Sequence, residues 1–201
     1  MSAPRQTRSR IMAIAERHLM RRGYHAFSYA DIASELGFKP AAIHYHFPTK
    51  TDLAVAVIHA YGDRFDAWDD ATAAWSSADR LAGYFEIGRR VADDKRMCLL
   101  SMAAAQQDAM PKPVTEAVHS LQRRIVDFYT ASLKDAREKG DASFSGRPDV
   151  EAMKVGSTLI GAQLIARIYG TKAYLQVMQQ QAQALGLPQQ WPEPPRTGRT
   201  P

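Results

Sequence analysis

Residues 28–50 read SYADIASELGFKPAAIHYHFPTK and predict two short helices joined by a tight turn. Ser28 is a good N-cap, and Asp31 follows it at the spacing of a capping box. Gly37 closes this first helix after about two turns, because glycine accepts the left-handed backbone conformation that often ends a helix. Pro40 fits the first position of the second helix, where its missing N–H costs nothing. The stretch therefore predicts a helix-turn-helix pair.

The second helix of this pair is short and carries polar aromatic side chains. It ends at Phe47, because the proline that follows pushes that residue out of the α-helical region. His44, Tyr45 and His46 lie on this helix, and Ile43 provides an apolar anchor. A helix-turn-helix can place such a helix in the major groove of DNA. The alternative is an ordinary helical hairpin, which any all-α protein can contain.

The positive charge of the chain is concentrated in its first quarter. Residues 1–50 hold eight Lys or Arg and three Asp or Glu, which accounts for the whole formal net charge of +5. Residues 51–201 are neutral in the same count. A basic segment joined to a neutral body is typical of a surface that meets a polyanion such as DNA. The alternative is a basic terminus that is merely solvated.

Further helices are predicted on both sides of the pair. After a flexible arm over residues 1–7, one helix begins near Thr7 and ends at Gly23. Its apolar face, at helical spacing, consists of Ile11, Ile14, Ala15, His18 and Leu19. Another helix begins at Thr49, which is capped together with Asp52, and runs to about Trp75.

The remainder of the chain predicts more helices and no strand. Prolines and glycines interrupt the helical pattern after residue 110 and again over residues 140–148. The predicted helices cover 77–93, 96–109, 113–139, 148–169 and 171–185. We therefore expect an all-α fold in three parts. These are a DNA-binding domain over 1–50, a larger helical domain over 51–186 for effector binding and dimerisation, and a proline-rich tail over 187–201 that is disordered or loosely draped.

The composition narrows the class of protein. No run of about 18 apolar residues could span a membrane, and the N-terminus lacks the apolar core of a secretory signal. The single cysteine, Cys98, excludes an internal disulfide and suits a reducing cytosol. We therefore expect a cytoplasmic protein that has no membrane partner.

Four common catalytic or cofactor-binding motifs do not occur in the sequence. A phosphate-binding loop, Gly-x-Ser-x-Gly, His-Glu-x-x-His and Cys-x-x-Cys are all missing. His44 and His46 are two residues apart, so they point to different faces of a helix and make a metal site improbable. We expect a protein that is not an enzyme and that uses no metal or cofactor. An all-α enzyme and an adaptor that binds a protein or membrane are the alternatives.

The N-terminal quarter resembles the TetR family of transcription regulators. The family pattern has Gly-Tyr after the first helix, Ser/Thr-x-x-Asp-Ile-Ala, Gly-Val, and a short recognition helix ending Tyr-x-Tyr/His-Phe-x-x-Lys-x-x-Leu. This chain has Gly23-Tyr24, the segment Ser28–Ala33, Gly37-Phe38, and the segment Ile43–Leu53. The resemblance covers about residues 8–55. It implies an all-α regulator with an N-terminal helix-turn-helix domain and a helical body.

The resemblance also implies roles by position. Ser28 and Tyr29 would contact phosphate from the start of the first helix of the pair. Lys50 would clamp a phosphate with the help of the next helix dipole. The residues that would face the DNA groove are Lys39, Pro40, Ala41, Ala42, His44, Tyr45 and His46.

The residues at the start of the predicted recognition helix differ from those that the family usually has there. Lys39 stands where the family usually has Ser, so the helix has a poor N-cap but gains a cation beside the DNA. Lys39 is the best candidate for a guanine contact, and Ala41 and Ala42 can offer methyl contacts to thymine. The chain contains no Asn, which excludes the Asn–adenine pair. For His44 and His46, the alternative is solvent exposure or packing on the first helix.

A regulator also needs a site for its signal, and the resemblance places a small-molecule pocket in the helical body. Adaptable methionines with a few polar groups suit a small apolar ligand. The candidate residues are Met97, Cys98, Met102, Gln106, His119, Gln122, Phe128, Gln163 and Tyr169. The alternative is that most of them belong to the core. Cys98 follows two basic residues that favour a reactive thiolate, so an electrophile or redox sensor and a buried core thiol are both open.

A dimer interface is predicted within residues 156–166, which are rich in small and apolar side chains. The residues proposed for close helix approach are Gly156, Gly161, Ala162 and Ile165. With helix 171–185 they could form a two-fold four-helix interface, and the alternative is packing within one chain. A homodimer matches a palindromic double-stranded DNA operator. We therefore predict a regulator that responds to an unidentified small-molecule effector and acts as a repressor.

Overall fold

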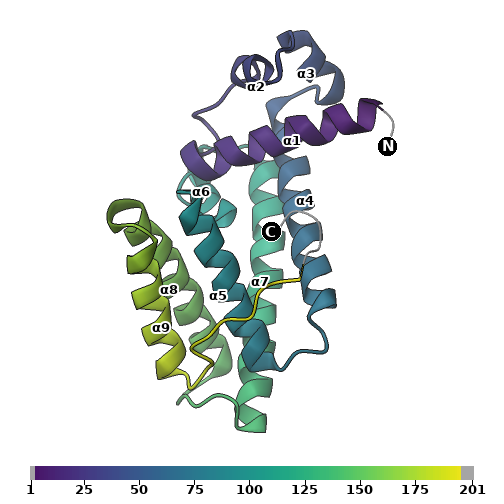
Figure 1. The fold of residues 1–201 in the computed structure, drawn as a ribbon. Coiled ribbons are helices and arrows are strands. Elements are labelled where there is room, and N and C mark those ends of the chain that lie inside the picture. The colour runs from purple at the N-terminus through teal and green to yellow at the C-terminus, as the bar shows by residue number, and fades with distance from the viewer. Residues whose placement is uncertain (1–2, 196–201) are drawn as a thin grey trace. The chain divides into compact units, whose positions relative to one another are not determined.

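The computed structural model describes residues 3–195, and within this range all regular secondary structure is helical (Figure 1). No helix of the described residues is long and apolar enough to cross a membrane. The helices are α1 (Ala3–Arg22), α2 (Tyr29–Leu36), α3 (Pro40–His46), α4 (Lys50–Ala71), α5 (Ser77–Asp93), α6 (Leu99–Ala104), the 3-10 helix η1 (Gln107–Ala109), α7 (Lys112–Lys139), α8 (Pro148–Tyr169) and α9 (Thr171–Ala184). The all-α prediction is confirmed.

The chain forms two compact units. The head unit consists of Met1–Tyr61 and Leu99–Leu121, and the body unit consists of Gly62–Cys98 and Gln122–Pro201. The predicted DNA-binding segment lies wholly in the head unit. That unit also takes in residues 99–121, which the sequence analysis assigned to the body. Helices α4 and α7 each continue from one unit into the other.

Helix α1 supports the helix-turn-helix pair with a buried face. Ile11, Ala15 and Met20 are fully or almost fully buried on it. His18 is buried as well and contacts Glu35 of α2, with 2.7 Å between its Nε2 and Oε1. The helix begins at Ala3, so the predicted flexible arm is wrong for residues 3–7. Proline is accepted in a first helical turn, which lets the helix begin ahead of Thr7.

The local signals in residues 28–50 form the predicted structure. The Ser28 hydroxyl accepts the N–H of Asp31, and the Asp31 carboxylate accepts the N–H of Ser28, which completes the capping box. Gly37 has φ +68° and ends α2. Lys39 precedes α3 without a side-chain cap, and α3 ends before Phe47. The predicted helix-turn-helix is therefore confirmed.

Helix α4 begins with the predicted cap but ends earlier than predicted. Thr49 and Asp52 cap α4 reciprocally, as predicted. Helix α4 ends at Ala71 and not at Trp75, and at this end both the hydroxyl and the N–H of Thr72 donate to the Trp68 carbonyl.

The predicted helix over 96–109 is wrong in extent. It is divided into α6 and η1, with a turn at Gln106 between them. Helix α5 ends at a turn in which Lys95 has φ +54°, so α6 begins only at Leu99. A short helix followed by a turn leaves the Gln106 side chain available to other parts of the head unit.

An aromatic cluster forms the core of the body unit. The rings of neighbouring residues in this cluster lie with their centroids 5.3–6.2 Å apart, mostly edge to face, and the cluster consists of Phe65, Trp68, Tyr84, Phe128 and Tyr129. Such pairs stabilise a core beyond their buried area. Burial of Tyr84 raises the pKa of its phenol far above the usual value.

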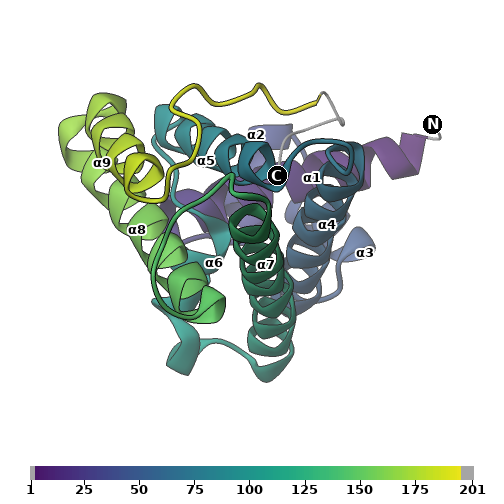
Figure 2. The same ribbon diagram turned by 90° about the horizontal axis from the view of Figure 1, so that it is seen from below.

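Helices α8 and α9 lie side by side and are joined through Gly170 (Figure 2). They are fixed to α5 by two buried polar groups. The Tyr174 hydroxyl donates to the Phe85 carbonyl over 2.6 Å, and the Gln163 amide lies 3.5 Å from the Gly88 carbonyl. Gly88 is required there, because a Cβ at this position would lie 2.3 Å from the Tyr174 hydroxyl.

The described part of the tail has no regular structure but packs on the body unit, where it crosses α5 (Figure 2). The Trp191 ring lies 5.9 Å from Phe85 and 6.2 Å from Tyr174, and Leu187 and Pro194 are buried. We expected a tail that is either disordered or loosely draped, and the residues up to Pro195 are draped over the body unit. Residues 196–201 lie outside the described range.

Replacing Ser28 with Ala should lower the free energy of unfolding by about 1 kcal/mol, because it removes one half of the capping box. Urea denaturation followed by circular dichroism measures this change. Ser34→Ala is the matched control, since Ser34 is exposed inside the same helix. Alanine is a better helix former than serine, so the control should be neutral or slightly stabilising. Equal losses for the two variants would contradict the capping role.

Candidate nucleic-acid interface

The outer face of α3 gathers most of the residues predicted to face DNA. Lys39, Pro40, Ala41, His44 and Tyr45 are exposed, and 82% of the Tyr45 side chain is accessible. Ala42 and His46 are half-buried. On the opposite face Ile43 is fully buried, and Phe47 follows it in the core. The helix therefore has one anchored face and one face that is open to a ligand.

Two aromatic contacts order side chains near this face. The His44 ring lies edge to face on Tyr29, with centroids 4.6 Å apart, and its Nδ1 lies 3.1 Å from the Pro48 carbonyl oxygen. His46 and Tyr45 are also in edge contact at 5.1 Å. The exposed His44 is thus partly engaged within the head unit, and Tyr45 is the largest side chain that projects from α3.

Ser28 lies exposed at the N-terminus of α2, as its predicted phosphate role requires. Its hydroxyl donates to the Asp31 carboxylate over 2.7 Å. Hydrogen bonds from the Ser28 hydroxyl and backbone lower the pKa of Asp31, so this carboxylate is ionised at neutral pH. A negative charge already occupies the favourable end of the α2 dipole. Phosphate attraction at Ser28 is weakened accordingly.

Tyr29 is placed differently from its predicted phosphate contact. The residue is buried, and its hydroxyl donates to the Phe47 carbonyl over 2.8 Å. Burial, with a smaller contribution from Asp52, raises the pKa of Tyr29 to about 12. In this structure Tyr29 connects the start of α2 to the end of α3, and its hydroxyl faces inward.

Lys50 also has an internal partner in place of the predicted phosphate. Its Nζ donates to the Phe27 carbonyl over 2.6 Å. The ammonium lies over the rings of Tyr24 and Phe27, 4.7 and 4.5 Å from their centroids. Partial burial lowers the pKa of Lys50, and Asp31 opposes this effect. The side chain holds the loop before α2 against α4, a role that sequence position alone could not show.

Two arginines of α1 flank the α3 face and were not singled out from the sequence. The Arg8 guanidinium lies 4.7 Å from the Phe47 ring centroid, and that of Arg10 lies 5.8 Å from the Phe38 ring centroid. Both arginines are exposed. The charge count of the first fifty residues included them, but only the fold shows that they stand next to the turn and the end of α3. Stacked arginines of this kind remain fully charged and suit phosphate contacts.

Comparison with known proteins agrees with this geometry. Residues 11–57 match the family described as bacterial regulatory proteins, tetR family. No curated protein matches the sequence.

Solved structures extend the likeness over the helices beyond this segment. A TetR-family regulator from Agrobacterium tumefaciens is 25% identical, with a TM-score of 0.85 over 90% of this chain and 98% of that one. A TetR regulator from Legionella pneumophila is 28% identical, with a TM-score of 0.80 over 89% and 97%. The regulatory protein TetR from Rhodobacter sphaeroides shares the fold at 18% identity, with a TM-score of 0.77 over 88% and 97%.

The chain has the fold of TetR-family transcription regulators, and its residues 11–57 match that family. TetR-family regulators bind DNA through a helix-turn-helix and typically act as homodimers. In this chain α2 and α3 form a helix-turn-helix pair of that kind.

The effector residues predicted from the TetR resemblance lie in both units. They are divided between the head unit, with Met102, Gln106 and His119, and the body unit, with Met97, Cys98, Gln122, Phe128, Gln163 and Tyr169. His119, Gln122 and Tyr169 are exposed on the surface. A single effector pocket formed by these residues stays a prediction.

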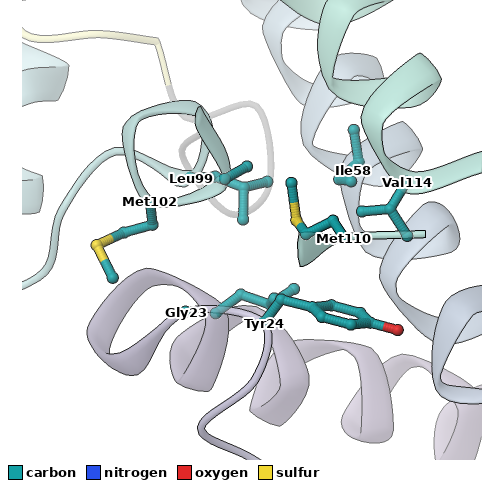
Figure 3. A pocket seen from close by; sticks show the side chains of 9 residues that line it. Gly23, Tyr24, Ile58, Leu99, Met102, Met110 and Val114 are labelled. Atoms are coloured by element: carbon teal, nitrogen blue, oxygen red, sulfur yellow. The ribbon is translucent and has the colours of Figure 1, made fainter. Parts of the chain in front are cut away.

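Only one of these residues lines the small apolar pocket of the head unit, and this is Met102 (Figure 3). The walls come from α1 and its end, α4, α6 and α7, and consist of Leu19, Gly23, Tyr24, Ile58, Leu99, Met102, Ala103, Met110 and Val114. The free volume is about 10 Å³, which is roughly the space that one water needs. In this conformation the pocket is too small for an effector-sized ligand.

In the body unit, Cys98 and Gln163 meet. The Cys98 backbone N–H donates to the Gln163 side-chain oxygen over 2.9 Å, and Gln163 is buried. The Cys98 side chain is half-buried. Met97 is buried next to it in sequence, and Phe128 belongs to the aromatic core. A half-buried thiol is compatible with both interpretations of Cys98.

The body unit also contains an open polar hollow of about 380 Å³ between the end of α4, α5 and α7. It carries two ion pairs, Arg80–Asp69 and Lys139–Asp135, and the Ser77 hydroxyl donates to Asp135 over 2.6 Å. Of the predicted effector residues, Phe128 alone lines this hollow. Among the described residues, no group of three or more His, Cys, Asp or Glu side chains could hold a metal ion.

Helix α8 presents an apolar face that fits the predicted dimer contact in part. Ile165 is exposed and Gly161 is half-buried, with no neighbouring atom near the position of a Cβ. Ala162 is buried and Gly156 is half-buried, so Ala162 packs within its own unit. Further exposed apolar side chains of this helix are Met153, Ile160, Leu164, Ile168 and Tyr169.

Tyr29→Phe should lower the free energy of unfolding by about 1 kcal/mol at neutral pH, because the Phe47 carbonyl loses its buried donor. The pKa of Tyr29 rises from 10.0 in the unfolded chain to about 12 in the folded one. The stabilisation by this phenol is therefore complete below pH 10 and is lost as the pH rises towards 12. The difference between wild type and variant should shrink over that range in denaturation experiments.

Tyr45→Phe is the matched control, since Tyr45 is the most exposed tyrosine of the α2–α3 pair. Its unfolding should equal that of the wild type at every pH. A Tyr29→Phe variant with unchanged stability would show that the hydroxyl does not hold α3.

Proposed function

We propose that this TetR-family protein is a repressor that binds a palindromic operator as a homodimer and is released by a small-molecule effector. The observation that carries the proposal is the exposed face at α3, which bears Lys39 and Tyr45, together with the exposed Arg8 and Arg10, whose guanidinium groups lie over the rings of Phe47 and Phe38. The cations supply the attraction to phosphate that dominates affinity for DNA. The α3 side chains supply contacts to base edges. A dimer bound over a promoter excludes polymerase by its size.

The sequence-reading residues in this proposal are Lys39, Ala41, Ala42 and Tyr45. The Lys39 ammonium is exposed ahead of α3 and suits the O6 and N7 acceptors of guanine. The exposed methyl group of Ala41 and the half-buried one of Ala42 suit thymine. Tyr29 and Lys50 act indirectly, because their polar atoms hold the Phe47 and Phe27 carbonyls.

The homodimer is proposed to form through the apolar face of α8. Met153, Ile160, Leu164 and Ile168 recur at spacings of seven and four residues and are all exposed, which places them on one face of a helix. Exposed contiguous apolar surface of this kind marks an interaction site. A two-fold interface joins the same face of both copies, which gives two recognition helices for two half-sites.

Release by an effector requires two states of the protein with different affinity for the operator. A ligand shifts this equilibrium only if it binds one state more tightly than the other. The proposal places the effector in the body unit, as in the sequence analysis, with a chemistry suited to apolar and aromatic walls. Because the proposed operator is DNA inside the cell, we also propose that the protein is cytoplasmic.

Lys39→Ala should weaken binding to a duplex recovered by in vitro selection with the wild-type chain by roughly tenfold or more, because one base contact contributes about 1–3 kcal/mol. It should also relax the preference for guanine at one position of each half-site. Competition binding with duplexes substituted at single positions measures both effects. Lys134→Ala, which changes an exposed lysine in the body-unit part of α7, should bind as the wild type does.

The same assay in rising salt tests the function itself. Wild-type affinity should fall steeply, since each neutralised phosphate releases counterions. Affinity that does not change with salt would contradict DNA binding through phosphates. A uniform loss for Lys39→Ala over all substituted duplexes would instead assign Lys39 to a phosphate.

Leu164→Arg should convert the dimer into a folded monomer that binds the selected duplex weakly, because it places two charges in the apolar α8 contact. Sedimentation measures the oligomeric state, and circular dichroism verifies the fold. Gln122→Arg, on the exposed surface of α7, should remain dimeric. A Leu164→Arg protein that stays dimeric would place the interface elsewhere.

A further inference from the structure

The loop between α1 and α2 is held by a segment that is distant in sequence. The Tyr24 backbone N–H donates to the Gln106 side-chain oxygen over 2.9 Å. One residue further, the His25 Nε2 lies 3.1 Å from the carbonyl oxygen of Ala109 in η1. Both partners belong to residues 99–121, the second part of the head unit. The turn between α6 and α7 therefore contacts the chain just ahead of the helix-turn-helix.

The fit between Gly23 and Gln106 is close. Gly23 has φ +82° and ends α1, and a Cβ at this position would lie 2.1 Å from the Gln106 side-chain nitrogen. Only glycine satisfies both the left-handed backbone and this approach. Tyr24 is buried, so its N–H would lack a solvent partner if the glutamine were absent. The Gln106 side chain is thus matched to the loop by shape as well as by hydrogen bonding.

The other side of the same loop is held by α4. The Lys50 ammonium lies over the Tyr24 and Phe27 rings, and the Thr51 hydroxyl lies 3.4 Å from that of Tyr24. The loop is consequently fixed between α4 and Gln106. It leads directly into the capping box at Ser28, where α2 begins, and α3 packs on α2. The loop therefore positions the start of α2 and, through the packing of α3 on α2, the start of the α2–α3 pair.

We propose that Gln106 is a positioning residue for DNA binding, which sets the α2–α3 pair by holding the Tyr24 N–H. The proposal rests on the proposed function, because it assigns to Gln106 a part in operator affinity without a contact to DNA. It differs from the sequence-based prediction, in which Gln106 lined an effector pocket. An acceptor on a side chain of this length is required at this position, so glutamate should replace glutamine and methionine should not.

Gln106→Met tests the proposal, since methionine has a similar length but no strong acceptor. Hydrogen exchange of the Tyr24 amide, followed by NMR, reports directly on the bond. We expect exchange to become roughly tenfold faster in the variant, as for the loss of one buried hydrogen bond. Affinity for the duplex selected with the wild-type chain should fall by a similar factor. Gln106→Glu retains the acceptor and should restore slow exchange and most of the affinity.

Gln107→Met is the matched control, because the neighbouring Gln107 contacts His119 and not the loop. It should leave the Tyr24 amide and the affinity unchanged. Wild-type exchange rates and affinity in Gln106→Met would overturn the proposal, and so would equal losses in Gln106→Met and Gln106→Glu. A wild-type chain that selects no duplex would refute the proposed function, while slow Tyr24 exchange that depends on Gln106 would still establish the contact.

Discussion

Two backbone carbonyls, those of Phe27 and Phe47, are the points at which the recognition helix is fixed. Helix α3 has seven residues, no side-chain N-cap and one fully buried side chain, Ile43. A helix of this length is not stable alone, because helix nucleation costs more than so few hydrogen bonds return. The Tyr29 hydroxyl binds the carbonyl at its end, and the Lys50 ammonium binds the carbonyl ahead of α2. Tertiary contacts thus leave the outer face of α3 available for DNA.

The sequence was sufficient to predict local structure where the two interacting residues are three or four positions apart. The Ser28–Asp31 and Thr49–Asp52 caps and the turn at Gly37 all form as predicted, because their partners lie within one helical turn. It was insufficient where the partner is set by packing. Tyr29 and Lys50 carry polar atoms that suit phosphate, yet the fold supplies internal carbonyls for both. Neither spacing nor residue type distinguishes these two outcomes.

The effector and dimer residues show the same limit at longer range. Gln106 and Gln163 were both predicted to line the effector pocket. In the structure the Gln106 side chain accepts a hydrogen bond from the Tyr24 N–H in the head unit, and the Gln163 side chain accepts one from the Cys98 N–H in the body unit. On α8, Ala162 and Ile165 are three residues apart, and one is buried while the other is exposed. The chain passes between its units within α4, between Cys98 and Leu99, and within α7. These connections are the covalent routes by which a change in the body unit can reach the recognition helix.

A crystal structure of the wild-type chain bound to its selected duplex tests the central claim most directly. We expect Lys39 and Tyr45 to meet base edges in the major groove, while the Tyr29 hydroxyl remains on the Phe47 carbonyl and the Lys50 ammonium on the Phe27 carbonyl. A complex in which Tyr29 and Lys50 have left these carbonyls for phosphate oxygens would contradict it. So would a complex in which α3 lies outside the groove.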